Sequence, residues 1–287
     1  MDAKQEMIKG ILPETFGFDS IARCLMVYGW EKPIGPEWID VIEDIFLVFG
    51  HEPFEGMGNL GELHSHGSYN RVRKRLRGFS ENPNESELFA IRVRSSPDFI
   101  DEAFFPCNIE VSLGFSHSNP KKAVVAVREA LISDYKELVT RIGKNFFDLF
   151  GSFYGGAWDF PAAFGPSDYM VSVRAIPGRL PYGINDAYAN RITRWRDNIW
   201  HKKCQVRSGY FREIYPINFL LETHLNAPFR GQPLYKFMEK NGSLEMFEFN
   251  EKMHCWNITE ENLDFVRKTL EPSGLVLSSA ANPLYLE

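Results

Sequence analysis

The sequence predicts an α+β fold, in which mixed or antiparallel sheets pack against a long amphipathic helix. Three observations lead to this class. Several short segments alternate apolar and polar residues, as half-buried strands do. Residues 120–150 carry apolar side chains at steps of 3 or 4 throughout, and residues 243–278 predict the order strand, strand, helix, strand. We expect a single compact protein over residues 1–287; two tandem halves, 20–155 and 167–280, are the alternative, with a polar insert at 51–85.

Outside the polar insert, the first half predicts three strands and two helices. The strands are expected over residues 21–28, 87–94 and 108–115. The first helix is expected over 36–49, where Trp38, Ile42, Ile45 and Phe49 are spaced 4, 3 and 4 apart. The insert is rich in Gly, Asn, Ser and charge, which predicts a long excursion with one short basic helix. The second helix is the long one over 120–150, with Asn119 as its cap and Gly151 at its end.

The second half begins after residues 153–166, whose Gly, Pro and aromatic residues predict a loop between the halves. A strand over 169–175 and a helix over 186–200 follow. The remaining elements are two short helices (217–224 and 233–240), two strands (243–249 and 253–258), a helix capped by Thr259 and a last strand (274–278).

Composition limits the class of protein. The chain has 287 residues, 24 of them Phe, which predicts a thick aromatic core. Its net charge of −6 disfavours a general nucleic-acid binder. The four cysteines form no CxxC pair, which fits free thiols in a reducing compartment. The first residues contain no apolar run of the kind that a signal peptide has. No stretch approaches the roughly 20 apolar residues of a membrane span. We therefore expect a soluble cytoplasmic protein that does not contact the membrane.

Two motifs in the insert suggest cofactor or metal chemistry without establishing it. Gly56-Met-Gly-Asn-Leu-Gly61 matches G-x-G-x-x-G, but a predicted helix precedes it, whereas a dinucleotide site needs a strand there. We read this stretch as a loop. His64 and His66 are weak candidate metal ligands, because no third ligand is evident nearby. We assign neither a cofactor nor a metal.

A basic run follows these motifs, and it has three interpretations. It could contact phosphates, an acidic protein surface, or solvent and nearby acids as an ordinary surface helix. Its members are Arg71, Arg73, Lys74, Arg75 and Arg77.

No catalytic residue is assigned. The sequence has no G-x-S-x-G motif, and Cys204 and Cys255 fit buried structural thiols better than nucleophiles. Whether the chain is an enzyme stays open, with a non-catalytic protein favoured.

Residues 207–226 form the most individual stretch of the chain. Tyr215-Pro216 predicts a junction from extended backbone to helix, because Pro disfavours helical backbone in the residue before it and suits the first helical turn. Arg212, Glu213 and Asn218 could tie backbone together across that junction. This scaffold role is favoured over a binding or catalytic one.

A family resemblance rests on four stretches in order: Tyr154-Gly-Gly156, Gly165-Pro-Ser-Asp-Tyr169, Trp195-Arg196 and Tyr210-Phe-Arg-Glu-Ile-Tyr-Pro-Ile-Asn-Phe219. Over roughly residues 87 to 280, the chain resembles immunity proteins of bacterial polymorphic and type VI secretion toxin systems, and related uncharacterised proteins. The motifs are structural, so the resemblance transfers no functional residue.

The resemblance implies a stoichiometric inhibitor that binds a toxin and neutralises it. Such a protein needs an exposed patch, and we expect aromatic anchors in it. The candidate partner-binding residues are Tyr154, Trp158, Tyr182, Arg212 and Tyr215. The alternative is a metal-dependent enzyme or binder that acts on a phosphate-containing or nucleic-acid substrate through residues 51–77. A third possibility is an assembly protein that oligomerises through its aromatic surface.

Overall fold

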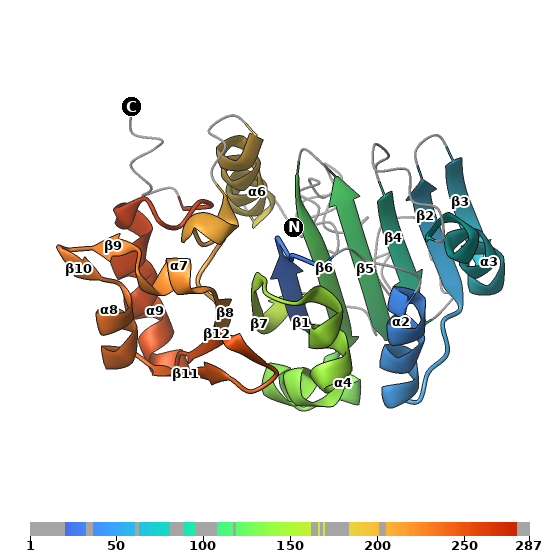
Figure 1. Cartoon of the computed structure of the whole chain (residues 1–287), viewed down its shortest axis with the longest axis horizontal. Coiled ribbons are helices and arrows are strands. Elements are labelled where there is room, and N and C mark those ends of the chain that lie inside the picture. The colour runs from blue at the N-terminus through green and yellow to red at the C-terminus, as the bar shows by residue number, and fades with distance from the viewer. Residues whose placement is uncertain are drawn as a thin grey trace, which may run out of the picture.

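The structure is a computed structural model, and it describes residues 21–32, 37–60, 63–80, 89–95, 108–116, 119–161, 184–200 and 205–279, together with Pro166 and Tyr169. Ten strands in these ranges form one antiparallel sheet (Figure 1). From edge to edge they are β11 (Ser243–Phe247), β12 (Asn250–Asn257), β8 (Ile217–Leu220), β7 (Tyr154–Pro161), β1 (Ile21–Tyr28), β6 (Asn119–Arg128), β5 (Ile109–Ser116), β4 (Phe89–Arg94), β2 (Glu55–Leu60) and β3 (Leu63–Ser68). Strands from both predicted halves thus pair in one sheet.

Two hydrophobic cores lie on the two faces of this sheet. β1 shows why: Leu25 and Val27 pack into one core, while Cys24, Met26 and Tyr28 pack into the other. Successive side chains of a strand point to opposite faces, so a central strand with a core on each side is apolar at nearly every position.

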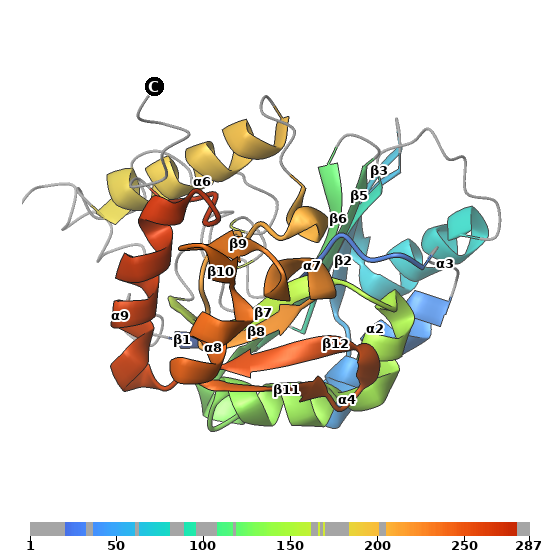
Figure 2. The same cartoon turned by 60° about the vertical axis from the view of Figure 1, so that its left-hand side comes forward.

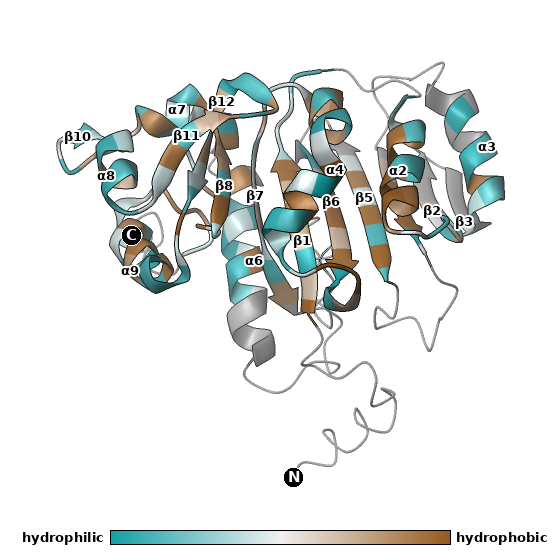
Figure 3. Cartoon of the chain, turned by 90° about the horizontal axis from the view of Figure 1, so that it is seen from below, coloured by the Kyte–Doolittle hydropathy of each residue, from teal (hydrophilic) through white to brown (hydrophobic). Residues whose placement is uncertain are grey.

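Different helices cover the two faces (Figure 3). On the first face lie α2 (Glu37–Val48) and α4 (Tyr135–Phe150), with Phe147 of α4 4.9 Å from Phe247 and 5.6 Å from Phe219, ring centre to ring centre. On the second face lie α6 (Ile184–Trp200) and α9 (Glu260–Leu270), with the short helices α7 (Glu222–Leu225) and α8 (Tyr235–Lys240). A two-stranded ribbon, β9 (Pro228–Phe229) and β10 (Gln232–Pro233), lies beside them. The predicted α+β class and aromatic-rich core are confirmed.

The predicted helix over 120–150 is wrong in its first part. Residues 119–128 are β6, and a helix begins only at Tyr135, where Asp134 accepts hydrogen bonds from the backbone N–H groups of Lys136 (2.9 Å) and Glu137 (2.8 Å). β6 lies between β1 and β5, and residues 123–127 are buried on both sides. A short apolar run of this kind fits a buried strand and a buried helix equally well.

The predicted loop over 153–166 is also wrong, since Tyr154–Pro161 is the central strand β7. Its glycines are required by packing rather than by a turn. A Cβ atom on Gly155 would lie 2.1 Å from the carbonyl oxygen of Met26, and one on Gly156 would lie 2.3 Å from the ring of Tyr215. Two further corrections are Ile217–Leu220, which is β8 rather than helix, and Val276, which forms a single bridge to Phe211 rather than a full strand.

The polar insert is more regular than predicted. It supplies β2 and β3 to the sheet and then the helix α3 (Tyr69–Ser80), which confirms the basic helix. Val72 of α3 packs against the backbone at Gly56, where an added Cβ would be only 3.0 Å away. The predicted strand over 169–175 lies outside the described residues, except for Tyr169 itself.

Candidate functional site

The 207–226 segment runs through the second core and anchors its neighbours by backbone hydrogen bonds. Phe211 N–H donates to the carbonyl oxygen of Leu275, and Leu277 N–H donates to that of Phe211, both at 2.9 Å. The fully buried Asn218 accepts from Tyr215 N–H (3.0 Å) and donates to the Tyr215 carbonyl oxygen (2.6 Å). The segment therefore acts as scaffold, as its sequence favoured.

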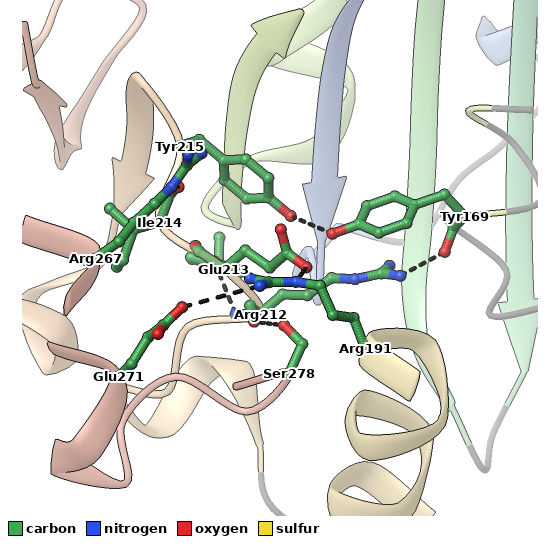
Figure 4. Close-up of polar contacts among 10 residues, drawn as sticks. Tyr169, Arg191, Arg212, Glu213, Ile214, Tyr215, Arg267, Glu271 and Ser278 are labelled. Atoms are coloured by element: carbon green, nitrogen blue, oxygen red, sulfur yellow. Dashed lines mark hydrogen bonds and ion pairs between the residues drawn. The ribbon is translucent and has the colours of Figure 1, made fainter. Parts of the chain in front are cut away.

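Arg212 is the centre of this region and is fully buried. Its guanidinium donates to the hydroxyl of Tyr28. It also donates to the carbonyl oxygen of Tyr169 (Figure 4). It also lies over the ring of Tyr169, 3.8 Å from the ring centre, and 5.1 Å from that of Trp195. Buried charge is tolerated when it is hydrogen-bonded and paired, and aromatic faces add to that pairing.

Glu213 supplies the negative charge beside Arg212. Its carboxylate accepts from Arg191 Nε at 2.8 Å, and Arg191 also lies 3.9 Å from Glu271. Burial alone would raise the pKa of Glu213, but Arg191 and Arg212 outweigh burial and lower it below its usual value. Glu213 thus stays ionised and holds α6 against the segment.

Four tyrosines enclose the two charges. Tyr154 accepts from Arg212 N–H at 2.9 Å and donates to the Glu213 carbonyl oxygen at 3.1 Å, while Tyr215 stacks on Trp158 with 4.2 Å between ring centres. Burial raises the pKa of Tyr28 to about 12 and raises the pKa values of Tyr154, Tyr169 and Tyr215 well above their usual value. The phenols therefore stay neutral near pH 7 and act as hydrogen-bonding groups.

His224 closes the end of the same segment. It is fully buried, and it stacks on Tyr154 with ring centres 5.0 Å apart. Its Nδ1 accepts from Leu221 N–H at 3.3 Å, so its Nε2 carries the proton toward the Tyr210 carbonyl oxygen at 3.2 Å. Burial lowers the pKa of His224 to about 4, so the ring is neutral near pH 7.

The structure does not place the predicted aromatic anchors on the surface. Tyr154 and Arg212 are 0% exposed, Tyr215 is 1% exposed and Trp158 is 7% exposed. Each is fixed by internal contacts, so the expectation of exposed anchors at these positions is corrected. Tyr182 lies outside the described residues.

The basic run is partly used inside the protein. Arg73 forms a two-point ion pair with Glu43 of α2, with 2.9 Å from Nη2 to Oε2, and Arg77 pairs with Asp40. Tyr69 adds a hydrogen bond to Glu43 at 2.8 Å. Of the remaining members, Arg71 and Lys74 are exposed, and the side chain of Arg75 is not described. The reading of the run as a helix matched to nearby acids holds for two residues, although the acids are on α2 rather than in the insert.

The other sequence candidates find little support. His64 and His66 lie in β3, two positions apart. Within the described residues, no group of three or more His, Cys, Asp or Glu side chains could hold a metal ion. Gly56 and Gly58 belong to β2 and do not open a helix, so the predicted loop is wrong and the glycine pattern lacks the geometry of a dinucleotide site. Burial raises the pKa of Cys255 to about 12, which fits a structural thiol.

Sequence reasoning missed three residues of the site. Tyr28 lies 184 positions from Arg212 in the chain, and Tyr169 and Arg191 come from two further segments. The only local signal was Arg212-Glu213 beside Tyr215. It indicated side-chain contacts across the junction, but it did not indicate which residues they would contact.

Comparisons with known proteins identify a fold but no family. No family model matches the chain, and no curated protein matches it. Among solved structures, it is similar to the Pseudomonas aeruginosa T6SS protein PA0821, with a TM-score of 0.52 and 9% sequence identity over 90% of this chain and 73% of that one. At this identity the likeness shows a shared fold. In the described part of the chain, no helix is long and apolar enough to cross a bilayer.

Proposed function

We propose that this chain is a non-catalytic protein-binding module of the immunity type, which binds a toxin and neutralises it in the cytoplasm. The observation that carries the proposal is the fold shared with a T6SS protein over most of the chain. This likeness points in the same direction as the resemblance of residues 87–280 to immunity proteins of type VI secretion toxin systems.

The polar core is compatible with this role. Arg212, Glu213 and His224 are hydrogen-bonded inside the protein. Arg191 and Arg212 keep Glu213 ionised, and burial keeps His224 neutral. These residues hold the two-sided sheet in one arrangement, which is what a rigid binding surface needs. The net charge of −6 would speed association with a basic partner.

A co-expression assay tests the proposal. The binding partner captured from the native host is expressed alone and then together with this chain. We expect growth arrest in the first case and normal growth in the second. Growth that is unaffected by the partner alone, or arrest that this chain does not relieve, would rule out the immunity role.

A further inference from the structure

β11 lies at one edge of the ten-stranded sheet and pairs with β12 on its inner side. Figure 2 shows it outside β12. Its register with β12 is regular from Ser243 to Met246 and shifts between Met246 and Phe247. A strand at a sheet edge directs alternate N–H and C=O groups outward, where they can pair with another extended chain.

The side chains of this edge are open to a partner. Ser243, Glu245 and Met246 are exposed, and the exposed fraction of Met246 is 62%. A pairing strand would cover Met246 with its own side chains, since side chains on neighbouring strands lie beside one another.

Charge on this edge selects the partner. Glu245 lies in β11, Glu248 lies in the turn that follows, and Glu251 lies near the start of β12; all three are exposed. Burial is the main cause of the raised pKa of Cys255 in the neighbouring strand β12, and the negative charges of Glu245 and Glu248 reach that strand and raise this pKa further. Opposite charges on neighbouring strands attract, and like charges repel.

Two other arrangements are less favourable. If two copies paired antiparallel about the middle of β11, their Glu245 side chains would lie opposite each other. At the other edge of the sheet, β3 contains Gly67 with φ of 145°, which interrupts the regular extended backbone.

We propose that the β11 edge binds an extended, lysine- or arginine-rich segment of a partner protein, which adds to the sheet beside β11. This inference rests on the proposed function, in that it assumes a protein partner, and it names the surface that the partner would use.

The test uses purified full-length protein and a labelled peptide of alternating valine and lysine, with a valine–glutamate peptide as its charge-reversed counterpart. Fluorescence anisotropy measures binding, and hydrogen-exchange mass spectrometry locates it. We expect the lysine peptide to bind more tightly than the glutamate peptide and to slow amide exchange in residues 243–247. Glu245→Lys should weaken binding of the lysine peptide by about 2- to 30-fold, because it removes one attractive cross-strand pair and adds a repulsive one.

Asp44→Lys is the matched control, since it makes the same charge change at an exposed position of α2, and α4 lies between α2 and β11 (Figure 1). It should change binding by less than Glu245→Lys does. Circular dichroism confirms that both variants are folded.

Three results would overturn the proposal: no binding of the lysine peptide, protection at residues other than β11, or equal effects of the two variants. Protection of β11 that rises with protein concentration alone would assign this edge to a second copy instead. Because the peptide assay needs no toxin, its failure leaves the growth assay to decide the proposed function, and failure of the growth assay leaves the peptide result standing.

Discussion

Replacing Arg212 by Met is the sharpest test of how this protein is held together. The change keeps much of the side-chain volume and removes the charge and its hydrogen bonds to Tyr28 and Tyr169. Hydrogen bonds to a charged group contribute about 1.5–3 kcal/mol each, and a desolvated cation–ring contact contributes about 2 kcal/mol. Burying the guanidinium costs several kcal/mol, which offsets part of this.

The net effect is dominated by what the variant leaves behind. The carbonyl oxygen of Tyr169 loses its guanidinium donor in the interior, and Glu213 keeps Arg191 but loses its second cation. Removing one partner from a buried charged network typically costs about 3–5 kcal/mol. That is a large share of the roughly 5–15 kcal/mol by which folded proteins are stable.

Urea unfolding at neutral pH, followed by circular dichroism, measures this loss. Arg71→Met is the control, because Arg71 is exposed and its replacement should change stability by no more than about 0.5 kcal/mol. If the free energy of unfolding of Arg212→Met lies within about 1 kcal/mol of that of the unchanged protein, the guanidinium does not hold the core together and the expected loss is refuted.

Three further predictions follow from local geometry. The pKa of His224 is about 4 in the folded chain and 6.5 in the unfolded chain, so the unfolded chain takes up the proton first as the pH falls. The free energy of unfolding therefore decreases from about pH 6.5 towards pH 4, by about 2 kcal/mol between pH 7 and 5. In urea titrations, His224→Gln should abolish that share of the pH dependence. Gly156→Ala should lower the free energy of unfolding by about 1–3 kcal/mol, because the new Cβ meets the ring of Tyr215; an unchanged melting temperature would contradict this. A double-mutant cycle on Arg73 and Glu43 should give a coupling of about 0.5–1 kcal/mol that shrinks in high salt, and a salt-independent coupling would argue against an ion pair at the surface.

The helices that sequence reasoning located have one exposed face, whereas β1 was located as a short apolar run although both of its faces are buried. α2 and α9 carry an apolar stripe opposite exposed charges. α2 was predicted over 36–49 and spans Glu37–Val48, and α9 begins directly after its predicted cap, Thr259. The strands β6 and β7 were missed for the opposite reason. Each is buried on both faces, so neither alternates, and the periodicity of side chains loses its information.

The site was harder to predict than the fold. Gly155-Gly156 indicates a turn when seen alone, whereas its role depends on how closely Met26 and Tyr215 approach. Arginine is ordinarily exposed, and the burial of Arg212 depends on partners distant in the chain. No local pattern encodes such contacts, which explains why Tyr154 and Trp158 were expected on the surface.

A stoichiometric inhibitor, the role proposed for this chain, binds its toxin in a fixed ratio. Affinity capture of the tagged full-length chain from its native host, followed by native mass spectrometry, tests this role most directly. The account predicts one protein partner in a fixed ratio, and that partner should be toxic when expressed alone. Recovery of the chain by itself, or with nucleic acid that salt removes, would contradict the account.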